Sequence, residues 1–217
     1  MKKIFFLSLL LFAFGFGNAQ SERYLKTMEA KVAAIDTTYN PAGLVELANT
    51  FERIGDAEKT QWLPYYYAAL AHVNSGLMQM NGGSVDAAKT DPIADKAEAA
   101  LNKAAALTPD NAEVQILRKM IANLRMMGDP MNRFMTYGQQ GAQALAKAKT
   151  LNPDNPRIYM LEAQDKFYTP EQFGGSKAEA KTLFETAMQK FASFKPESSL
   201  HPQWGKRTVQ YFIAQAK

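Results

Sequence analysis

The sequence predicts an all-α fold in which about four helix pairs stack into one domain. Alternation of apolar and polar side chains, which would indicate strands, hardly occurs in the 217 residues. Ala-rich stretches instead have apolar residues spaced three and four apart, which is the spacing of one helix face. A proline that would stop a helix follows three of these stretches, at Pro109, Pro153 and Pro196.

Residues 1–19 are predicted to be a cleaved signal peptide. Lys2 and Lys3 precede an apolar run at Ile4–Phe16, and small residues stand before a cut after Ala19. The run is shorter than the roughly 20 residues that a membrane-spanning helix needs. We therefore expect an exported, periplasmic protein that is not embedded in a membrane.

Charge and cysteine content exclude several functions. Removing two lysines from the 25 basic residues leaves 23 against 21 acidic residues, a net charge of +2. This balance, without a dense basic run, argues against nucleic-acid binding. The absence of cysteine excludes disulfides, thiolate metal sites and a catalytic cysteine.

The predicted helices follow one another in pairs along the chain. Asn111 and Asn155 are suited to cap helices, and Pro156 to start one. Gly-Gly, Ser and Asp between residues 76 and 91 predict a loop insertion, whose order is left open. The expected elements are 21–35 with 41–54, 64–73 with 95–107, 112–127 with 139–151, 156–168 with 176–191, and a closing helix at 202–215.

The second helix of each pair has small and large apolar residues in a fixed order. A small residue allows a neighbouring helix to approach, and a large one fills the adjoining groove. The order is Ala97, Leu101 and Ala104; then Gly141, Leu145 and Ala148; then Ala180, Phe184 and Ala187; with a weaker copy at Leu44, Ala48, Phe51 and Ile54.

This pattern resembles the tetratricopeptide repeat, whose second helix has the form A-x3-F-x2-A-x2-L-x-P. The resemblance implies an α-α superhelix with a concave binding face. The repeats here are 39 to 53 residues apart rather than 34, and Ala163 replaces a usual glycine. The chain is also similar to exported helical-repeat proteins of Bacteroidota that have DPM-x-R-x3-YG and YTPEQFGG strings, present here at Asp129–Gly138 and Tyr168–Gly175. The resemblance to that family implies that this protein is exported and has a helical-repeat fold. The family has no assigned biochemical activity, so the resemblance implies none here.

The first candidate binding site is the turn at Asp129–Gly138. Asp129 is suited to cap a short helix on which Arg133 and Tyr137, four residues apart, share one face. A guanidinium beside a phenol suits a carboxylate, a phosphate or a peptide terminus. The alternative is that Arg133 pairs with a helix C-terminus or with an acid of the next repeat.

The second candidate is the turn at Tyr168–Gly175. Tyr168, Glu171, Gln172 and Phe173 precede two glycines that permit a sharp turn, where backbone N–H groups could hold an anion. The alternative is a structural connection whose aromatic residues fill a gap between repeats. Both turns are expected on one edge of the superhelix.

The third candidate is aromatic. Tyr65, Tyr66 and Tyr67 are consecutive, and successive helix residues point about 100° apart, so at least one is expected to face a groove or solvent. Tyr66 is our candidate for that position, with core packing as the alternative. The methionines at 120, 126, 127, 131 and 135 could ligate copper, although filling the core is the favoured interpretation.

The sequence contains no nucleophile motif, and its two histidines lie far apart at His72 and His201. We therefore expect no catalysis, no cofactor and no metal site. The predicted function is a scaffold that binds another protein or peptide through its concave face and turn edge. The alternative is a binding protein for a small ligand such as a peptide or glycan fragment. The identity of the partner and the oligomeric state are left open.

Overall fold

The computed structural model describes residues 22–80 and 86–215, so the predicted signal peptide lies outside the described residues. All regular structure in this part of the chain is helical, which confirms the predicted all-α class. Residues 22–35 form the N-terminal helix. The elements after it are α2 (Pro41–Glu58), α3 (Trp62–Met80), α4 (Ala87–Leu107), α5 (Ala112–Gly128), α6 (Pro130–Arg133), η1 (Phe134–Gly138), α7 (Gln139–Leu151), α8 (Pro156–Tyr168), η2 (Glu171–Phe173), α9 (Lys177–Ser193) and α10 (Lys206–Gln215). None of the described helices is long and apolar enough to cross a membrane.

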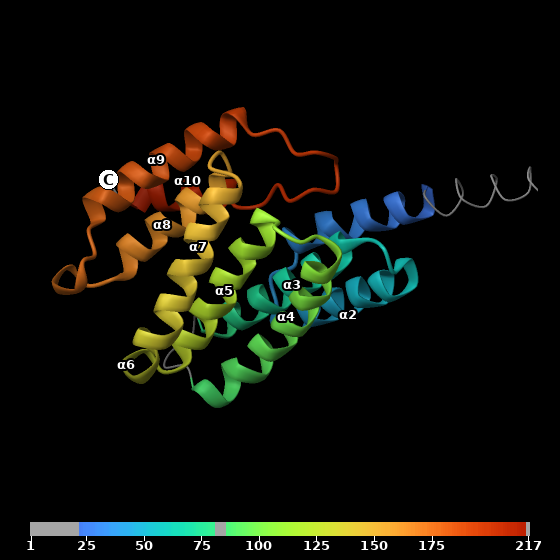
Figure 1. Ribbon diagram of the computed structural model, residues 1–217, viewed down its shortest axis with the longest axis horizontal. Helices are drawn as coiled ribbons and strands as arrows, with labels where there is room; N and C mark the ends of the chain where they lie inside the picture. Colours follow the sequence, from blue (N-terminus) through green and yellow to red (C-terminus); the bar gives the residue numbers. More distant parts are fainter. Residues whose placement is uncertain (1–21, 81–85, 216–217) are drawn as a thin grey trace, which may run out of the picture.

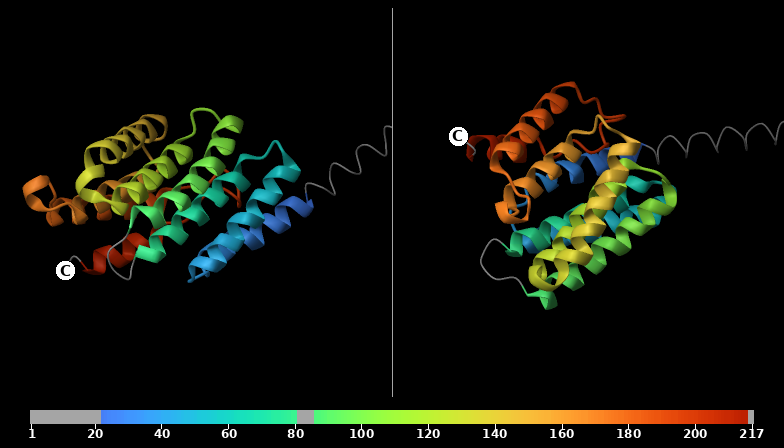
Figure 2. Two further views of the ribbon diagram at one scale, coloured as in Figure 1. Left: turned by 90° about the horizontal axis from the view of Figure 1, so that it is seen from below. Right: turned by 60° about the vertical axis from the view of Figure 1, so that its left-hand side comes forward.

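Most helices that are neighbours in the chain also pack against each other. α2 lies against α3, α3 against α4, α4 against α5 and α5 against α7, and α8, α9 and α10 follow as a further group. Figures 1 and 2 show the first of these helices side by side, with the last group lying across one side of them.

The repeated apolar residues form the contacts between these helices, as the sequence predicts. The nine residues of the three main copies are all buried, and so are Leu44, Ala48 and Phe51 of the weaker copy. Gly141 shows why one of the small positions is a glycine. A Cβ atom there would lie 2.9 Å from Cδ of Lys119, whose side chain runs beneath α7. The alternation of size therefore sets how closely the helices approach.

The predicted helix caps are confirmed. The side chain of Asn111 accepts hydrogen bonds from the backbone N–H groups of Glu113 and Val114. Asn155 caps α8 in the same way, through the N–H of Arg157, and Pro156 is the first residue of that helix.

Two predicted boundaries are wrong. The loop insertion predicted at 76–91 is largely helical, because α3 continues to Met80 and α4 begins at Ala87. Gly76, which suggested a loop, is buried in α3, where a Cβ atom would lie 2.8 Å from Leu124. The closing helix begins at Lys206 rather than at residue 202, because Gly205 has a φ of +105°, a conformation that ends regular helix geometry.

The chain returns to its beginning between α9 and α10. Residues 194–205, which we call the return segment, extend from the last helix pair towards the N-terminal helix (Figure 1). The hydroxyl of Tyr67 donates to the carbonyl oxygen of Leu200 at 2.7 Å, and Ser199 donates to Glu29 at 2.9 Å. These contacts join the two ends of the row of helices.

Candidate functional site

The three consecutive tyrosines of α3 are all buried, so the expectation that one faces a groove or solvent is wrong. α3 is covered on every side, by α2, α4, α5 and the return segment, and each tyrosine hydroxyl has its own partner. Tyr65 donates to Asp56 at 2.7 Å, and burial with this carboxylate raises the pKa of Tyr65 to about 12. Tyr66 has no exposed surface, so it presents nothing to a ligand.

Tyr66 belongs instead to a group of buried polar residues, which we call the polar junction. Glu113 accepts from Tyr66 at 3.0 Å, from Asn155 at 2.6 Å and from two nitrogens of Arg157. Trp204 of the return segment donates its indole N–H to the hydroxyl of Tyr66 at 2.9 Å. The guanidinium of Arg157 also lies over the rings of Trp204 and Phe194. The junction therefore ties α3, α5, α8 and the return segment together.

The first candidate turn holds its polar residues in internal contacts. Asp129 caps α6 by accepting from the N–H of Asn132. Arg133 forms a bidentate ion pair with Asp91 of α4, at 2.7 and 2.8 Å, and donates to the carbonyl of Arg125 near the end of α5. Its guanidinium lies 5.7 Å from the ring centre of Tyr137. The hydrogen bond with Asp91 raises the pKa of Arg133 and lowers that of Asp91. A ligand of Arg133 would have to replace Asp91.

The same turn presents a row of apolar side chains to solvent. Its residues 134–138 form a π-helical turn, a rare geometry that is frequent at functional sites. With the end of α5, the turn exposes 39% of Met127, 93% of Met131, 50% of Phe134 and 67% of Met135. Side chains as exposed as Met131 and Met135 contribute little to the core, so the row needs another explanation.

The conformation of the second candidate turn is fixed by its glycines and by backbone hydrogen bonds. Gly174 has a φ of +91°, and a Cβ atom on Gly175 would collide with the carbonyl oxygen of Thr169. The N–H groups of residues 173–176 all donate to carbonyl oxygens within the turn or at the end of α8. These four amides are therefore not available for the anion that the sequence suggested. Glu171 and Gln172 are exposed.

The aromatic residues of the second turn are exposed as well. Tyr168 and Phe173 each expose 68% of their surface, and Tyr211 of α10 exposes 60%. Tyr168 and Tyr211 both contact the ring of Phe212, at centre distances of 5.8 and 5.5 Å. Lys177 lies nearby, 5.7 Å from the ring centre of Phe167. This part of the surface combines flat aromatic area with positive charge.

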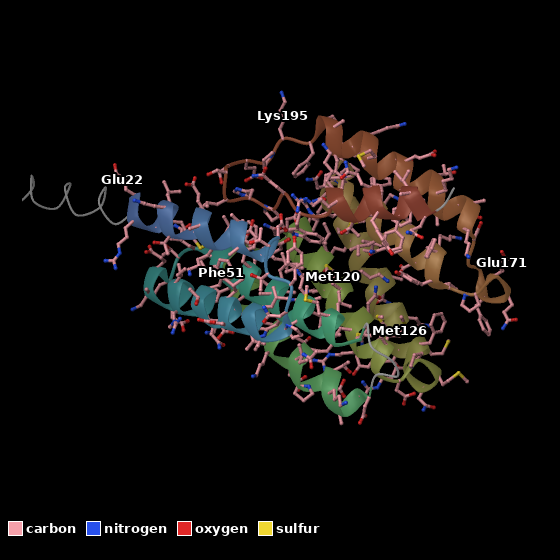
Figure 3. All side chains as sticks on the ribbon, turned by 180° about the vertical axis from the view of Figure 1, so that it is seen from behind. Glu22, Phe51, Met120, Met126, Glu171 and Lys195 are labelled. Atoms are coloured by element: carbon pink, nitrogen blue, oxygen red, sulfur yellow. The ribbon has the colours of Figure 1, made fainter. Side chains whose placement is uncertain are left out.

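The two exposed groups lie at the same end of the molecule. Figure 3 shows Glu171 at the tip of the second turn and Met126 beside the first, both far from Glu22 at the other end. We call this region the turn-end surface. It contains seven of the ten large apolar residues that are exposed in the described part of the chain: Met127, Met131, Phe134, Met135, Tyr168, Phe173 and Tyr211.

A trough of about 340 Å³ lies above α5, between α4 and α7. Its floor is apolar, with Leu101, Ile121 and Ala122. Its walls include Arg118 and Lys147, together with the amides of Gln115, Gln140 and Gln143. Within residues 22–80 and 86–215, Arg118 has no carboxylate partner and donates only to Asn102 at 3.3 Å. Glu98 also lines the trough and Lys147 pairs with Asp110 at 3.2 Å, so Arg118 is the side chain best placed to bind a negatively charged group there.

The apolar part of the turn-end surface was missed in the sequence. Met131, Phe134 and Met135 stand inside a string that was interpreted through its Arg133 and Tyr137. Apolar residues in a polar connection are the available signal, because a turn of a small helical domain has little core to contribute to. Over the two described ranges, no group of three or more His, Cys, Asp or Glu side chains could hold a metal ion.

Comparison with known proteins finds similarity to a solved structure. No family model and no curated protein matches the chain. The solved structure of the HusA haemophore from Porphyromonas gingivalis superimposes with a TM-score of 0.78 at 33% sequence identity. The alignment covers 89% of this chain and 92% of the haemophore. Identity at this level over nearly the whole of both chains shows common descent: the chain belongs to the family of all-helical proteins that includes the HusA haemophore.

Proposed function

We propose that this protein binds haem or a related porphyrin without catalysing a reaction. The observation that carries the proposal is the turn-end surface, where seven of ten exposed large apolar residues gather in a member of a haemophore's family. A porphyrin is a flat apolar macrocycle with two carboxylates on one edge. Exposed Met, Phe and Tyr side chains with a lysine beside them match that chemistry.

The local chemistry of the surface supports a tetrapyrrole over a peptide. Phe134 and Met135 offer deformable apolar contacts, and Tyr168 and Tyr211 offer flat rings. The thioether of methionine and the phenol of tyrosine are also groups that ligate haem iron in other proteins. Lys177 can attract a carboxylate at the rim.

Titration of the purified protein with haemin, followed by the Soret absorbance, tests the proposal. Two double variants separate the two halves of the surface, Phe134→Ser with Met135→Ser, and Tyr168→Ser with Phe173→Ser. Each removes apolar contact area, and we expect the half that binds haem to lose affinity by about tenfold or more. Metal-free protoporphyrin IX, titrated in parallel, shows whether the iron contributes.

The matched control is Leu25→Ser with Tyr39→Ser, because these residues are also exposed, by 42% and 75%, and lie in the first part of the chain. This control should bind haemin as the wild type does. Wild-type protein that leaves the Soret band of haemin unchanged would contradict the proposed function. Equal affinity in all three variants would exclude the turn-end surface as its site.

The trough favours a second candidate, the binding of an acidic peptide. Arg118 would meet a carboxylate of the peptide, Lys147 would exchange its exposed partner Asp110 for another, and the three glutamine amides could bond a peptide backbone. A fluorescein-labelled pentaglutamate peptide tests this by anisotropy, with Arg118→Gln and Lys147→Gln as the variant. The control is Lys181→Gln with Arg207→Gln, which removes the same charge from exposed positions on α9 and α10.

Further parts of the proposal concern architecture and location. The pairing of α3 with α4, α5 with α7 and α8 with α9 supports a tetratricopeptide-like stack of helix pairs in a single domain. Export to the periplasm after cleavage at Ala19 agrees with the family of a haemophore. Cell fractionation with the N-terminal sequence of the mature protein tests this, and cleavage should leave Gln20 first.

A further inference from the structure

The methionines of this protein divide sharply by exposure. Met28, Met120 and Met160 are buried. The three methionines that count as exposed in the described ranges all lie between residues 127 and 135. Met131 exposes 93% of its surface and Met135 67%, against 39% for Met127, so an oxidant in solution reaches the sulfur atoms of the first two most readily.

We propose that Met131 and Met135 are sites of reversible oxidation by hydrogen peroxide, and that their oxidation lowers the affinity of the turn-end surface for a porphyrin. The inference rests on the proposed function. In the reaction, the thioether sulfur attacks one peroxide oxygen, the O–O bond breaks, and a sulfoxide and water are formed. The sulfur loses two electrons and the peroxide gains them. A methionine sulfoxide reductase reverses the step: two thiols supply the electrons and protons, and the thioether, a disulfide and water are formed.

The consequence follows from polarity. A sulfoxide replaces a deformable apolar group with a polar, chiral one. On a buried methionine this would disturb the core, but Met131 and Met135 contact little of it, so the fold remains intact. What changes is the apolar area that the surface offers to a flat apolar ligand. Oxidation at these two positions therefore alters binding without altering stability.

The test compares treated and untreated protein. Wild-type protein is exposed to hydrogen peroxide, its oxidised peptides are identified by mass spectrometry, and its affinity for protoporphyrin IX is measured. The metal-free porphyrin avoids reaction of peroxide with iron. We expect oxygen to be added first at Met131 and Met135, affinity to fall about tenfold, and the melting temperature to stay unchanged.

The variant Met131→Leu with Met135→Leu keeps apolar side chains of similar volume that peroxide cannot oxidise. It should bind protoporphyrin IX before and after treatment with the same affinity. The control, Met120→Leu with Met160→Leu, should stay as sensitive as the wild type, because those thioethers are buried.

The outcomes separate the two proposals. Failure of the untreated wild type to bind any porphyrin would overturn the proposed function and this inference with it. Unchanged affinity of protein that is oxidised at both residues would overturn the inference alone. A loss of affinity in the leucine variant equal to that of the wild type would do the same, since the loss would then arise elsewhere.

Discussion

The polar junction and the turn-end surface arrange their residues in opposite ways. In the junction, charged and polar groups are buried, and Glu113 bonds to Tyr66, Asn155 and Arg157. On the turn-end surface, Met131 and Phe173 are exposed and pack against little. Buried polar groups and exposed apolar groups are each costly, so each needs a compensating interaction.

The difference lies in where that interaction comes from. The junction is satisfied within the chain, because Glu113 and Arg157 neutralise each other and their neighbours complete the hydrogen bonds. On the turn-end surface, Tyr168 and Tyr211 contact Phe212, but most of the surface of each of these two tyrosines stays exposed. The junction therefore stabilises the fold from within, whereas the turn-end surface is the basis of the proposed porphyrin site.

The largest effect is expected at the junction, from Glu113→Ala. The substitution leaves the guanidinium of Arg157 buried without its carboxylate, which typically costs about 3–5 kcal/mol. Urea denaturation measures the loss. The matched control is Glu179→Ala, which breaks the exposed pair with Lys166 and should cost about 1 kcal/mol or less. Equal losses in the two variants would mean that the junction is not the stronger element.

A smaller effect is expected from pH at His72, another buried polar group. Burial in α3, with a contribution from Lys96, lowers the pKa of His72 to about 4, although Glu52 lies 3.8 Å away. The unfolded chain takes up this proton near pH 6.5, before the folded protein does, so stability is complete above pH 6.5 and falls as the pH drops towards 4. The loss attributable to His72 is at most about 3 kcal/mol.

Urea denaturation at several pH values, repeated on His72→Gln, isolates this contribution. The variant should lose less stability between pH 6.5 and 4 than the wild type does. Parallel curves for the two proteins would show that the pKa of His72 is the same in the folded and unfolded states.

The next effect concerns the return segment. Tyr67→Phe removes the hydroxyl that donates to Leu200 and leaves a buried carbonyl without that donor, at a cost of about 1–2 kcal/mol. Amide hydrogen exchange in residues 194–205 should quicken more than exchange in α2. The control Tyr211→Phe alters an exposed hydroxyl and should change neither the free energy of unfolding nor the exchange rates. If Tyr67→Phe lowered amide protection equally over the whole chain, the hydrogen bond to Leu200 would not act locally on the return segment.

The smallest effect is expected on the turn-end surface. Phe173→Ser changes an exposed side chain, so the free energy of unfolding should stay within about 0.5 kcal/mol of the wild type. Urea denaturation is again the measurement. A loss above 2 kcal/mol would show that the aromatic ring is part of the folded core, and the contrast with the junction would disappear.

Local patterns predicted the helices and most of their contacts. The order Ala97, Leu101 and Ala104 repeats at the same face of later helices, and helix periodicity relates such residues directly to burial. The cap at Asn155 follows from residue type and the adjacent Pro156. The position of Gly76 was misread, because a glycine that breaks a helix and one that permits close packing look alike in sequence.

The candidate sites were predicted less well, since their chemistry depends on distant residues. Tyr66 meets Trp204 across 138 positions, and Arg133 meets Asp91 across 42. No local pattern identifies such partners. The sequence therefore predicts that Arg133 and Tyr66 contact a ligand, although in the structure Arg133 forms an ion pair and Tyr66 forms hydrogen bonds within the protein. Tyr168 and Phe173 lie at a turn, as the sequence predicts, and both are exposed.

The return segment also affects the order in which the molecule can fold. An open row of helix pairs can begin anywhere and grow by contacts between neighbours. Here Ser199 donates to Glu29 across 170 positions, so the contacts of the return segment join residues near the two ends of the described chain. Closing so long a loop is slow. The chain consequently cannot complete its fold until almost all of it has been made.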